Sequence, residues 1–367
     1  MASLGETLQE RTRVGDLYEK LDEKRIRCFA CGHLCPIPEG AQGVCKVRFN
    51  RGGKLMVPYG YIAGAQADPV EKKPFFHARP GALAFSFGML GCDLHCSYCQ
   101  NWLTSQALRD PKAVSSVLEV TPRQLVSAAV SQGAEIVVST YNEPLITSEW
   151  AVAVFDEARK AGLMTGFVSN GNGTPRVLEY LKPHTDLYKV DLKGFDERRY
   201  RSLGGRLQPV LETIRLLHQM GFWVEIVTLL VPGFNDSDAE ISRLTEFIAG
   251  VSPNIPWHVT AFHPDYKMTD PDYTGAEDLV RTAAIGRRAG LNYVYAGNLP
   301  GRLGSLENTY CPTCRRLLIE RRGFRVLSYS MTAEGACPSC SAIIPGRWAP
   351  SYRPQIADYP QAPHLRL

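Results

Sequence analysis

The sequence predicts an α/β protein built around a partial (β/α) barrel close to the TIM architecture. Between residues 82 and 297, short apolar runs alternate with amphipathic stretches, and this alternation is typical of repeated βα units. Residues able to carry chemistry directly follow five of these apolar runs, and sites on such sheets lie at the carboxyl ends of strands. Periodicity also allows an open, doubly wound sheet, which is the alternative fold.

The expected strands and helices follow one another in a regular order. The apolar runs that predict strands cover residues 82–89, 135–140, 164–169, 187–192, 223–231, 257–262 and 293–296. The amphipathic stretches that predict helices cover residues 122–132, 149–161, 175–181, 210–220, 238–249 and 277–289. Several of these stretches end at glycine, as at Gly133 and Gly162, and glycine commonly ends helices. Strands separated by helices indicate a parallel sheet.

Length and composition fit one large catalytic domain with appendages. The chain has 367 residues, 44% of them hydrophobic, which is enough to bury a large core. We expect a Cys-rich N-terminal segment at 1–75, the barrel at 76–303 and a C-terminal module with a tail at 304–367. The net charge of +4 is too small over this length to indicate a nucleic-acid surface.

The start of the chain does not predict export or membrane insertion. Residues 1–15 are charged and lack the apolar core of a signal peptide. No run approaches the ~20 apolar residues of a membrane span. We therefore expect a cytoplasmic protein without membrane contact.

The eleven cysteines fall into three sets, and none is left over. A disulfide scaffold is typical of small secreted chains, so metal binding is the better explanation in a long chain without an export signal. The sets are Cys28, Cys31, Cys35 and Cys45; Cys92, Cys96 and Cys99; and Cys311, Cys314, Cys337 and Cys340.

The N-terminal set has the spacing C-x2-C-x3-C-x9-C and offers four thiolates. Glycines at positions 32, 40 and 43 allow tight turns between them. Ligand type alone leaves both zinc and a second [4Fe–4S] cluster open, because thiolate sites accept either. Structural zinc is our first expectation for this set.

The central set has the spacing C-x3-C-x2-C in one short loop. It supplies three thiolates, whereas a [4Fe–4S] cluster is usually held by four, so one iron would be left open. An open iron can bind a small molecule through nitrogen and oxygen, which is the chemistry of radical enzymes that use S-adenosylmethionine. The alternative is a structural zinc site with His95 as the fourth ligand.

This loop carries a resemblance to a known family. With Tyr98 before its last cysteine, and with Tyr-Asn-Glu-Pro at 141–144 and Asp-Leu-Lys at 191–193 downstream, the chain resembles the radical SAM superfamily and its glycyl-radical-activase-like branch. Nearly the whole chain, including both Cys-rich ends, resembles the radical SAM enzymes of the AmmeMemo system. The resemblance implies a partial barrel of the radical SAM type, with a [4Fe–4S] cluster and S-adenosylmethionine as cofactors.

The same resemblance implies a reaction and partners. Cys92, Cys96 and Cys99 would hold the cluster and be the catalytic residues, and S-adenosylmethionine would be cleaved reductively to methionine and a 5′-deoxyadenosyl radical. The radical would abstract hydrogen from an unknown small-molecule or protein substrate. An electron donor such as flavodoxin or ferredoxin is implied, and partner proteins of the AmmeMemo system are candidates. The alternative is a catalytically silent iron–sulfur or zinc scaffold that binds partner proteins.

Residues after the second expected strand match the part of the family motif that contacts the methionine amino group. The family has a Gly-Gly-Glu-like segment there, and this chain has Tyr141, Asn142 and Glu143. A carboxylate and backbone carbonyls can accept hydrogen bonds from an ammonium group. The resemblance therefore implies that Asn142, Glu143 and the loop residue Tyr98 bind the cofactor.

Two further strand ends offer cofactor-binding groups. Asp191 and Lys193 alternate along a strand and so face the same side, where buried charges need a partner or a charged ligand. By resemblance, Lys193 would engage the cofactor carboxylate and Asp191 its ammonium or ribose, with a structural ion pair as the alternative. Ser169 and Asn170 follow another strand and offer short groups suited to a ribose or a carboxylate.

The C-terminal set has the spacing of a zinc ribbon. Two C-x2-C pairs, at 311–314 and 337–340, are separated by 22 residues. Four thiolates close a tetrahedral zinc site and leave no place for a substrate, so the predicted role is structural.

Overall fold

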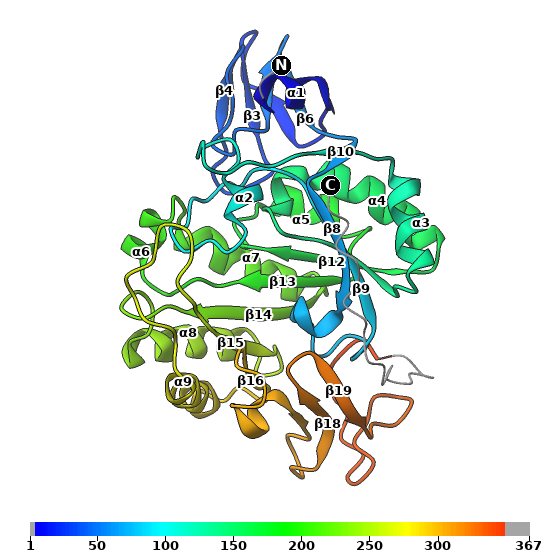
Figure 1. The fold of residues 1–367 in the computed structure, drawn as a ribbon, viewed down its shortest axis with the longest axis vertical. Helices are drawn as coiled ribbons and strands as arrows, with labels where there is room; N and C mark the ends of the chain where they lie inside the picture. Colours follow the sequence, from blue (N-terminus) through cyan, green and yellow to red (C-terminus); the bar gives the residue numbers. More distant parts are fainter. Residues whose placement is uncertain (1–3, 349–367) are drawn as a thin grey trace.

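The computed structural model describes residues 4–348 of the chain, and its centre is one eight-stranded sheet (Figure 1). Residues 1–3 and 349–367, the latter part of the expected C-terminal tail, lie outside the described residues. The seven expected strands are present with closely matching bounds. The strands of the sheet are β8 (Gly64–Pro69), β9 (Leu83–Gly88), β11 (Ile136–Ser139), β12 (Met164–Ser169), β13 (Leu187–Asp191), β14 (Trp223–Leu230), β15 (Trp257–Ala261) and β16 (Val294–Gly297).

The order of the strands distinguishes between the two candidate folds. From β9 to β16 the strands lie side by side in the same order as in the chain, and each neighbouring pair is parallel. A doubly wound sheet reverses its strand order part-way across, and this sheet does not. The prediction of a partial (β/α) barrel is therefore confirmed. The unpredicted strand β8 pairs antiparallel with β9 at the edge.

Helices connect the parallel strands as expected. They begin at local signals: Thr121 accepts a hydrogen bond from the Gln124 backbone N–H in a capping box, and Pro122 is the first helical residue. The six expected helices are α3 (Pro122–Ser131), α4 (Ser148–Lys160), α5 (Pro175–Leu181), α7 (Leu207–Gln219), α8 (Asp238–Val251) and α9 (Ala276–Arg288). Short helices that were not expected are α2 (Trp102–Ser105), α6 (Glu197–Ser202) and the 3-10 helices η1 (Val70–Lys72), η2 (Pro144–Thr147) and η3 (Gly304–Glu307).

The core lies on both faces of the sheet. Strands β9, β11 and β15 are buried at every position, as expected for parallel strands covered on both sides. Trp150 and Phe155 of α4 pack in one cluster with Phe167 and Tyr188 of the sheet. A buried scaffold of this kind holds the strand ends rigidly, and the candidate site is built on those ends.

The N-terminal part forms small antiparallel sheets at one end of the molecule (Figure 1). The buried ion pair between Arg48 and Glu149 joins it to α4. The elements of this part are α1 (Leu4–Glu10), β1 (Thr12–Val14), β2 (Tyr18–Lys20), β3 (Arg25–Cys28), β4 (Pro36–Pro38), β5 (Phe49–Arg51), β6 (Lys54–Pro58) and β7 (Tyr61–Ile62), the last paired with β10 (Leu118–Glu119). The domain boundaries at 75 and 303 stay predictions, and β8, which precedes residue 75, pairs into the barrel sheet.

The C-terminal module lies at the opposite end of the long axis (Figure 1). It contains a three-stranded antiparallel sheet of β17 (Thr309–Tyr310), β18 (Leu317–Arg322) and β19 (Arg325–Tyr329). Buried Arg321 donates to the carbonyl of Phe76 over 2.8 Å. The ring of His77 donates from Nδ1 to the carbonyl of Pro345 over 2.8 Å and accepts at Nε2 from the hydroxyl of Tyr295 over 2.6 Å. These contacts attach the module to the barrel.

Within residues 4–348, no helix has the length and apolar character needed to cross a bilayer.

Candidate active site and metal centres

The central cysteines lie on the loop that follows β9. Gly91 opens this loop with φ +93, and a Cβ there would lie 3.1 Å from the carbonyl oxygen of Cys45. Glycine is therefore required both by the backbone conformation and by the close approach of the N-terminal part. Cys96 is buried, Cys92 and Cys99 are half-buried, and all three are free thiols.

Donors and a cation surround the sulfurs of this loop. The backbone N–H of Leu94 donates to Cys92 Sγ over 3.4 Å, and the Ser105 hydroxyl lies 3.2 Å from Cys99 Sγ. Burial raises the pKa of Cys96 to about 12, and the positive charge of Lys193 opposes this. A buried thiol ionises when a metal binds it, and hydrogen bonds to sulfur are characteristic of iron–sulfur sites. The loop therefore fits a [4Fe–4S] cluster held by three thiolates.

A buried carboxylate ties this loop to the end of β12. Both oxygens of Asp93 accept hydrogen bonds, from the side-chain amides of Asn170 and Asn172, each over 2.7 Å. The ring Nε2 of His33 lies 3.1 Å from the Asp93 carbonyl oxygen. We did not predict a role for Asp93 or Asn172. The available signal was an acidic residue directly after the first cysteine of the loop.

The structure brings Glu143, Ser169 and Asn170 together. The carboxylate of buried Glu143 accepts from the Ser169 hydroxyl over 2.7 Å and from the backbone N–H groups of Asn170 and Leu145 over 2.7 Å and 3.0 Å. Burial, followed by the charge of Asp93, raises the pKa of Glu143 to about 8. A carboxyl group at this place can therefore hold a proton near neutral pH.

Tyr141 and Asn142 form the turn that leads into Glu143. Tyr141 has φ +71, a left-handed conformation that favours glycine, which gives a physical reason for the glycine in the family motif. Asn142 accepts from the Met89 backbone N–H over 2.9 Å and donates to the Glu143 carbonyl over 3.2 Å. Its side chain thus holds the ends of β9 and β11 together.

Asp191 lies between two lysines. Lys189 donates a short hydrogen bond to one oxygen of Asp191, and Lys193 Nζ lies 3.9 Å from the other. Burial favours the neutral acid, but the charges of Lys189 and Lys193 outweigh it and lower the pKa of Asp191. Lys189 was not predicted, although it lies two positions before Asp191 on the same face of β13. Because its charge also acts on Cys96, Lys193 links this group to the cysteine loop.

Tyr98 packs inside an apolar cluster beside the cysteines. Its ring meets that of Phe234 edge-on at 5.6 Å, and the side chains of Val231 and Phe262 belong to the same cluster. These partners follow β14 and β15, so the loop is supported from the far side of the barrel as well.

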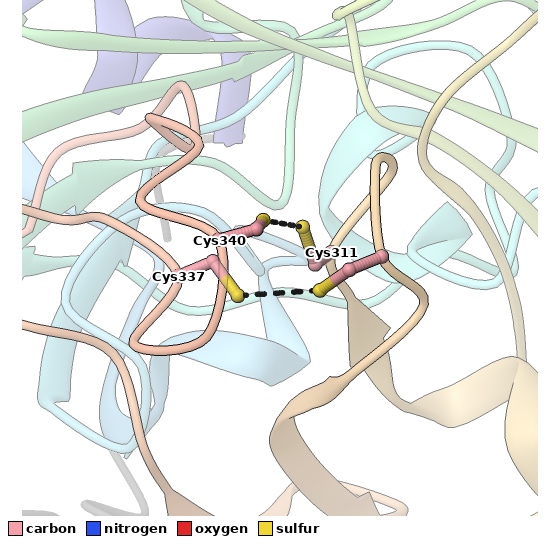
Figure 2. Close-up of side chains that lie close together, drawn as sticks. Cys311, Cys337 and Cys340 are labelled. Carbon is pink, nitrogen blue, oxygen red and sulfur yellow. Dashed lines mark hydrogen bonds between the residues drawn. The ribbon is translucent and has the colours of Figure 1, made fainter.

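The C-terminal cysteines form a compact site, shown in Figure 2. The Sγ atoms of Cys311 and Cys340 are 3.6 Å apart, as are those of Cys314 and Cys337, and all four lie within 4.8 Å of one another. Tetrahedral zinc with Zn–S distances of about 2.3 Å places its sulfurs about 3.8 Å apart. The four thiols thus fit a single ion, as the spacing in the sequence predicts.

The N-terminal cysteines lie close to the central loop. Cys28, Cys31 and Cys45 are buried and Cys35 is half-buried. The backbone N–H of Val44 points to Cys35 Sγ over 3.5 Å. Their assignment as a second metal-binding set stays a prediction.

The chain is similar to several known proteins. The sequence profile described as the radical SAM superfamily matches residues 88–245. The chain is 36% identical over 330 residues to the "Uncharacterized protein MJ0808" of Methanocaldococcus jannaschii, covering 89% of this chain and 97% of that protein. It is 29% identical over 183 residues to the pyruvate formate-lyase-activating enzyme of Staphylococcus aureus strain USA300, covering 47% of this chain and 72% of that enzyme.

The chain can also be aligned with solved structures. A radical SAM methyltransferase from Sphaerobacter thermophilus aligns with a TM-score of 0.48 and 14% identity, covering 84% of this chain and 81% of the other. Streptococcus suis SuiB bound to S-adenosylmethionine aligns with a TM-score of 0.43 and 15% identity. This alignment covers 64% of this chain and 52% of the SuiB chain.

Proposed function

This chain belongs to the same family as the Methanocaldococcus jannaschii protein and carries a radical SAM domain at residues 88–245, and we propose on that premise that it cleaves S-adenosylmethionine reductively. The products would be methionine and a 5′-deoxyadenosyl radical that abstracts hydrogen from a substrate. The observation that carries the proposal is the loop of three free thiols beside the polar end of β12 and the charged end of β13.

Cys92, Cys96 and Cys99 would each bind one iron of a [4Fe–4S] cluster. When bound, such a cluster supplies one electron and an open iron for the amino and carboxylate groups of S-adenosylmethionine. The Leu94 N–H and the Ser105 hydroxyl would stabilise the thiolates, and Tyr98 with its apolar neighbours would exclude water.

The strand ends would position S-adenosylmethionine. Lys193 would pair with the cofactor carboxylate, and Asp191 would accept hydrogen bonds from its ammonium or ribose, because both already lie in one charged group beside Cys96. Glu143, with Ser169 and Asn170 bound to it, would offer carboxyl and amide groups on the adjoining strand end. Asn142 would hold the turn in the shape that this pocket needs.

The finer assignment rests on likeness to relatives. The 29% identity to a pyruvate formate-lyase-activating enzyme supports a glycyl-radical-activase-like reaction, with a protein glycine as one candidate substrate and a small molecule as the other. The motifs at 141–144 and 191–193 support a member of the AmmeMemo system that acts with partner proteins of that system. Flavodoxin or ferredoxin would supply the electron, and the C-terminal four-cysteine site would hold zinc.

The decisive experiment is anaerobic reconstitution with iron and sulfide, followed by dithionite, S-adenosylmethionine and an assay for 5′-deoxyadenosine. We expect product from the intact chain and none from Cys96→Ala. Ser97→Ala, a change of the neighbouring side chain in the same loop, is the matched control and should stay active. An intact chain that binds about four loop irons yet makes no product would overturn the proposal and favour the silent scaffold.

A further inference from the structure

The three cysteine sets differ in how closely their sulfurs approach. The C-terminal sulfurs lie within 4.8 Å of one another, and elsewhere in residues 4–348 no three His, Cys, Asp or Glu ligand atoms gather as tightly. The central and N-terminal sulfurs are therefore both more widely spaced. A single zinc ion draws four sulfurs to about 3.8 Å, whereas the thiolates of an iron–sulfur cluster bind different irons and stand farther apart. The wider separation of the sulfur atoms in the central loop therefore suits a cluster better than a single zinc ion.

The N-terminal cysteines nevertheless lie on backbone segments that contact one another. The Cys28 N–H donates to the Cys35 carbonyl over 3.0 Å, and a Cβ on Gly43 would lie 3.6 Å from Cys35 Sγ. Cys28 and Cys35 are thus held side by side, while no three of the four sulfurs gather as tightly as those of the C-terminal site.

Two non-glycine residues next to these cysteines have a left-handed backbone conformation. Leu34, just before Cys35, has φ +47, and Lys46, just after Cys45, has φ +67. Non-glycine residues seldom adopt this left-handed conformation, and they do so where the surrounding structure requires it. The compact C-terminal site has the same feature, because Arg315 follows Cys314 with φ +63. The N-terminal loops are therefore shaped to present thiols, as the C-terminal loops are.

A buried cation lies beside this set. Arg48 is 1% exposed and donates to both oxygens of Glu149 over 2.7 Å. Its Nε is buried and has no hydrogen-bond partner among the described residues. The charges of Cys28 and Cys45 act on this guanidinium. A cluster held by four thiolates is negatively charged, and a buried cation lowers the cost of keeping that charge away from water.

The N-terminal loops are bound directly to the central loop. Arg109 donates to the Leu94 carbonyl over 3.1 Å and to the Val44 carbonyl over 2.6 Å, and so bridges the two. The ring of His33 lies 3.1 Å from the Asp93 carbonyl oxygen. The charge of Asp93 acts on both Cys31 and Cys92.

We propose that Cys28, Cys31, Cys35 and Cys45 bind a second iron–sulfur cluster, directly beside the central loop. This replaces our expectation of structural zinc at these residues. With a thiolate on every iron, such a cluster has no open coordination position, so its chemistry is limited to gaining and losing an electron. Its ligation is independent of the proposed function, and only the neighbouring cluster rests on that function.

The test begins from a chain that lacks the central ligands, the variant Cys92→Ala/Cys96→Ala/Cys99→Ala. After anaerobic reconstitution with iron, sulfide and zinc, we expect about four irons and about one zinc per chain. Adding Cys28→Ala and Cys31→Ala should remove the iron and keep the zinc, which also reports that the C-terminal module has folded. Val44→Ala, an exposed position between two ligands, is the matched control and should keep the iron.

Measurements on the unmodified chain keep the outcome clear if a variant fails to fold. About eight irons per reconstituted wild-type chain are expected; about four in the wild-type chain together with none in the triple variant would overturn the second cluster. Two zinc ions and no iron in the triple variant would also overturn it and restore the zinc assignment. If the central cluster fails to form but the second is present, the wild-type chain and the triple variant will hold equal amounts of iron.

Discussion

The side-chain amide of Asn170 donates to the carboxylate of Asp93 over 2.7 Å, which joins the end of β12 to the cysteine loop. Asp93 directly follows Cys92, and Asn170 is hydrogen-bonded through its backbone N–H to Glu143. One chain of buried hydrogen bonds therefore connects a proposed cluster ligand with two strand ends that form the proposed cofactor pocket. Movement of any of these groups would displace the others.

Replacing Asp93 with asparagine should loosen the cysteine loop. The change removes a charged acceptor from two amide donors, and hydrogen bonds to charged groups contribute about 1.5–3 kcal/mol each. We expect a lower melting temperature and a lower iron content after reconstitution. Glu246→Gln, an exposed change on α8, is the control and should alter neither quantity. An Asp93→Asn chain that melts and binds iron like the wild type would contradict this role.

Lys193→Met should weaken binding of S-adenosylmethionine. Loss of one charge-assisted hydrogen bond corresponds to about a 10- to 100-fold rise in Kd. Isothermal titration of the reconstituted chain with S-adenosylmethionine measures this change. The control Lys160→Met removes an exposed lysine and should leave Kd unchanged. An unchanged Kd in Lys193→Met would mean that Lys193 serves only the ion pair with Asp191.

Arg48→Met should destabilise the protein strongly, because it leaves the Glu149 carboxylate buried without its partner. Breaking a buried pair from one side costs about 3–5 kcal/mol. Replacing both partners, in Arg48→Met/Glu149→Met, should recover much of that loss because no uncompensated charge remains. Thermal unfolding measures the stability of the two variants. A double variant less stable than the single one would show that the unpaired Glu149 carboxylate is not the cause of the loss.

Stability should fall at acid pH through His77. Burial lowers the pKa of His77 from 6.5 to about 4, so the unfolded chain takes up a proton there before the folded chain does. Proton uptake by the unfolded state stabilises that state, and about 2 kcal/mol should be lost between pH 7 and pH 5. In His77→Gln this part of the pH dependence should disappear.

The exposed histidine variant His218→Gln is the matched control for this titration. Its melting temperature should follow the wild-type pH profile. Equal profiles for the His77→Gln chain and the wild type would show that His77 does not cause the acid sensitivity.

Removal of the C-terminal metal should leave the central loop intact. Cys337→Ser takes away one of four ligands, so about one zinc per chain should be lost while loop iron and 5′-deoxyadenosine formation persist. Elemental analysis and the product assay measure both. Thr313→Ala, between two ligands of the same site, is expected to keep its zinc. Loss of iron together with zinc would show that the C-terminal module supports the barrel more deeply.

Local sequence patterns were sufficient for the βα units and for the cysteine loop. The runs that became β9 and β11 are mostly apolar, and the N-cap residue Thr121 followed by Pro122 marks the start of a helix. The edge strand β8 was missed because its sequence, Gly-Ala-Gln-Ala-Asp-Pro, has no apolar run. Its conformation depends on pairing with β9, which is a tertiary contact.

The residues of the candidate site likewise fall into those that the sequence identified and those that it did not. Cysteine spacing and the residues at strand ends identified Cys92, Cys96, Cys99, Glu143 and Asp191 as candidates. Lys189 was not identified, because its burial depends on neighbouring strands and helices, and Asp93 was not, because its amide partners lie 77 and 79 residues away. No local pattern reports such distant partners.

The amino-acid sequence by itself determined which residues can bind metal and which strands carry them, because spacing along one loop or one strand restricts the side chains to a common side. Only the tertiary structure decided that the C-terminal sulfurs lie within 4.8 Å of one another and that buried Arg48 pairs with Glu149. These contacts join segments remote in sequence, as does the approach of Gly91 to Cys45. Whether a set of thiols suits one zinc ion or a cluster depends on sulfur distances of this kind, which spacing along the chain does not fix.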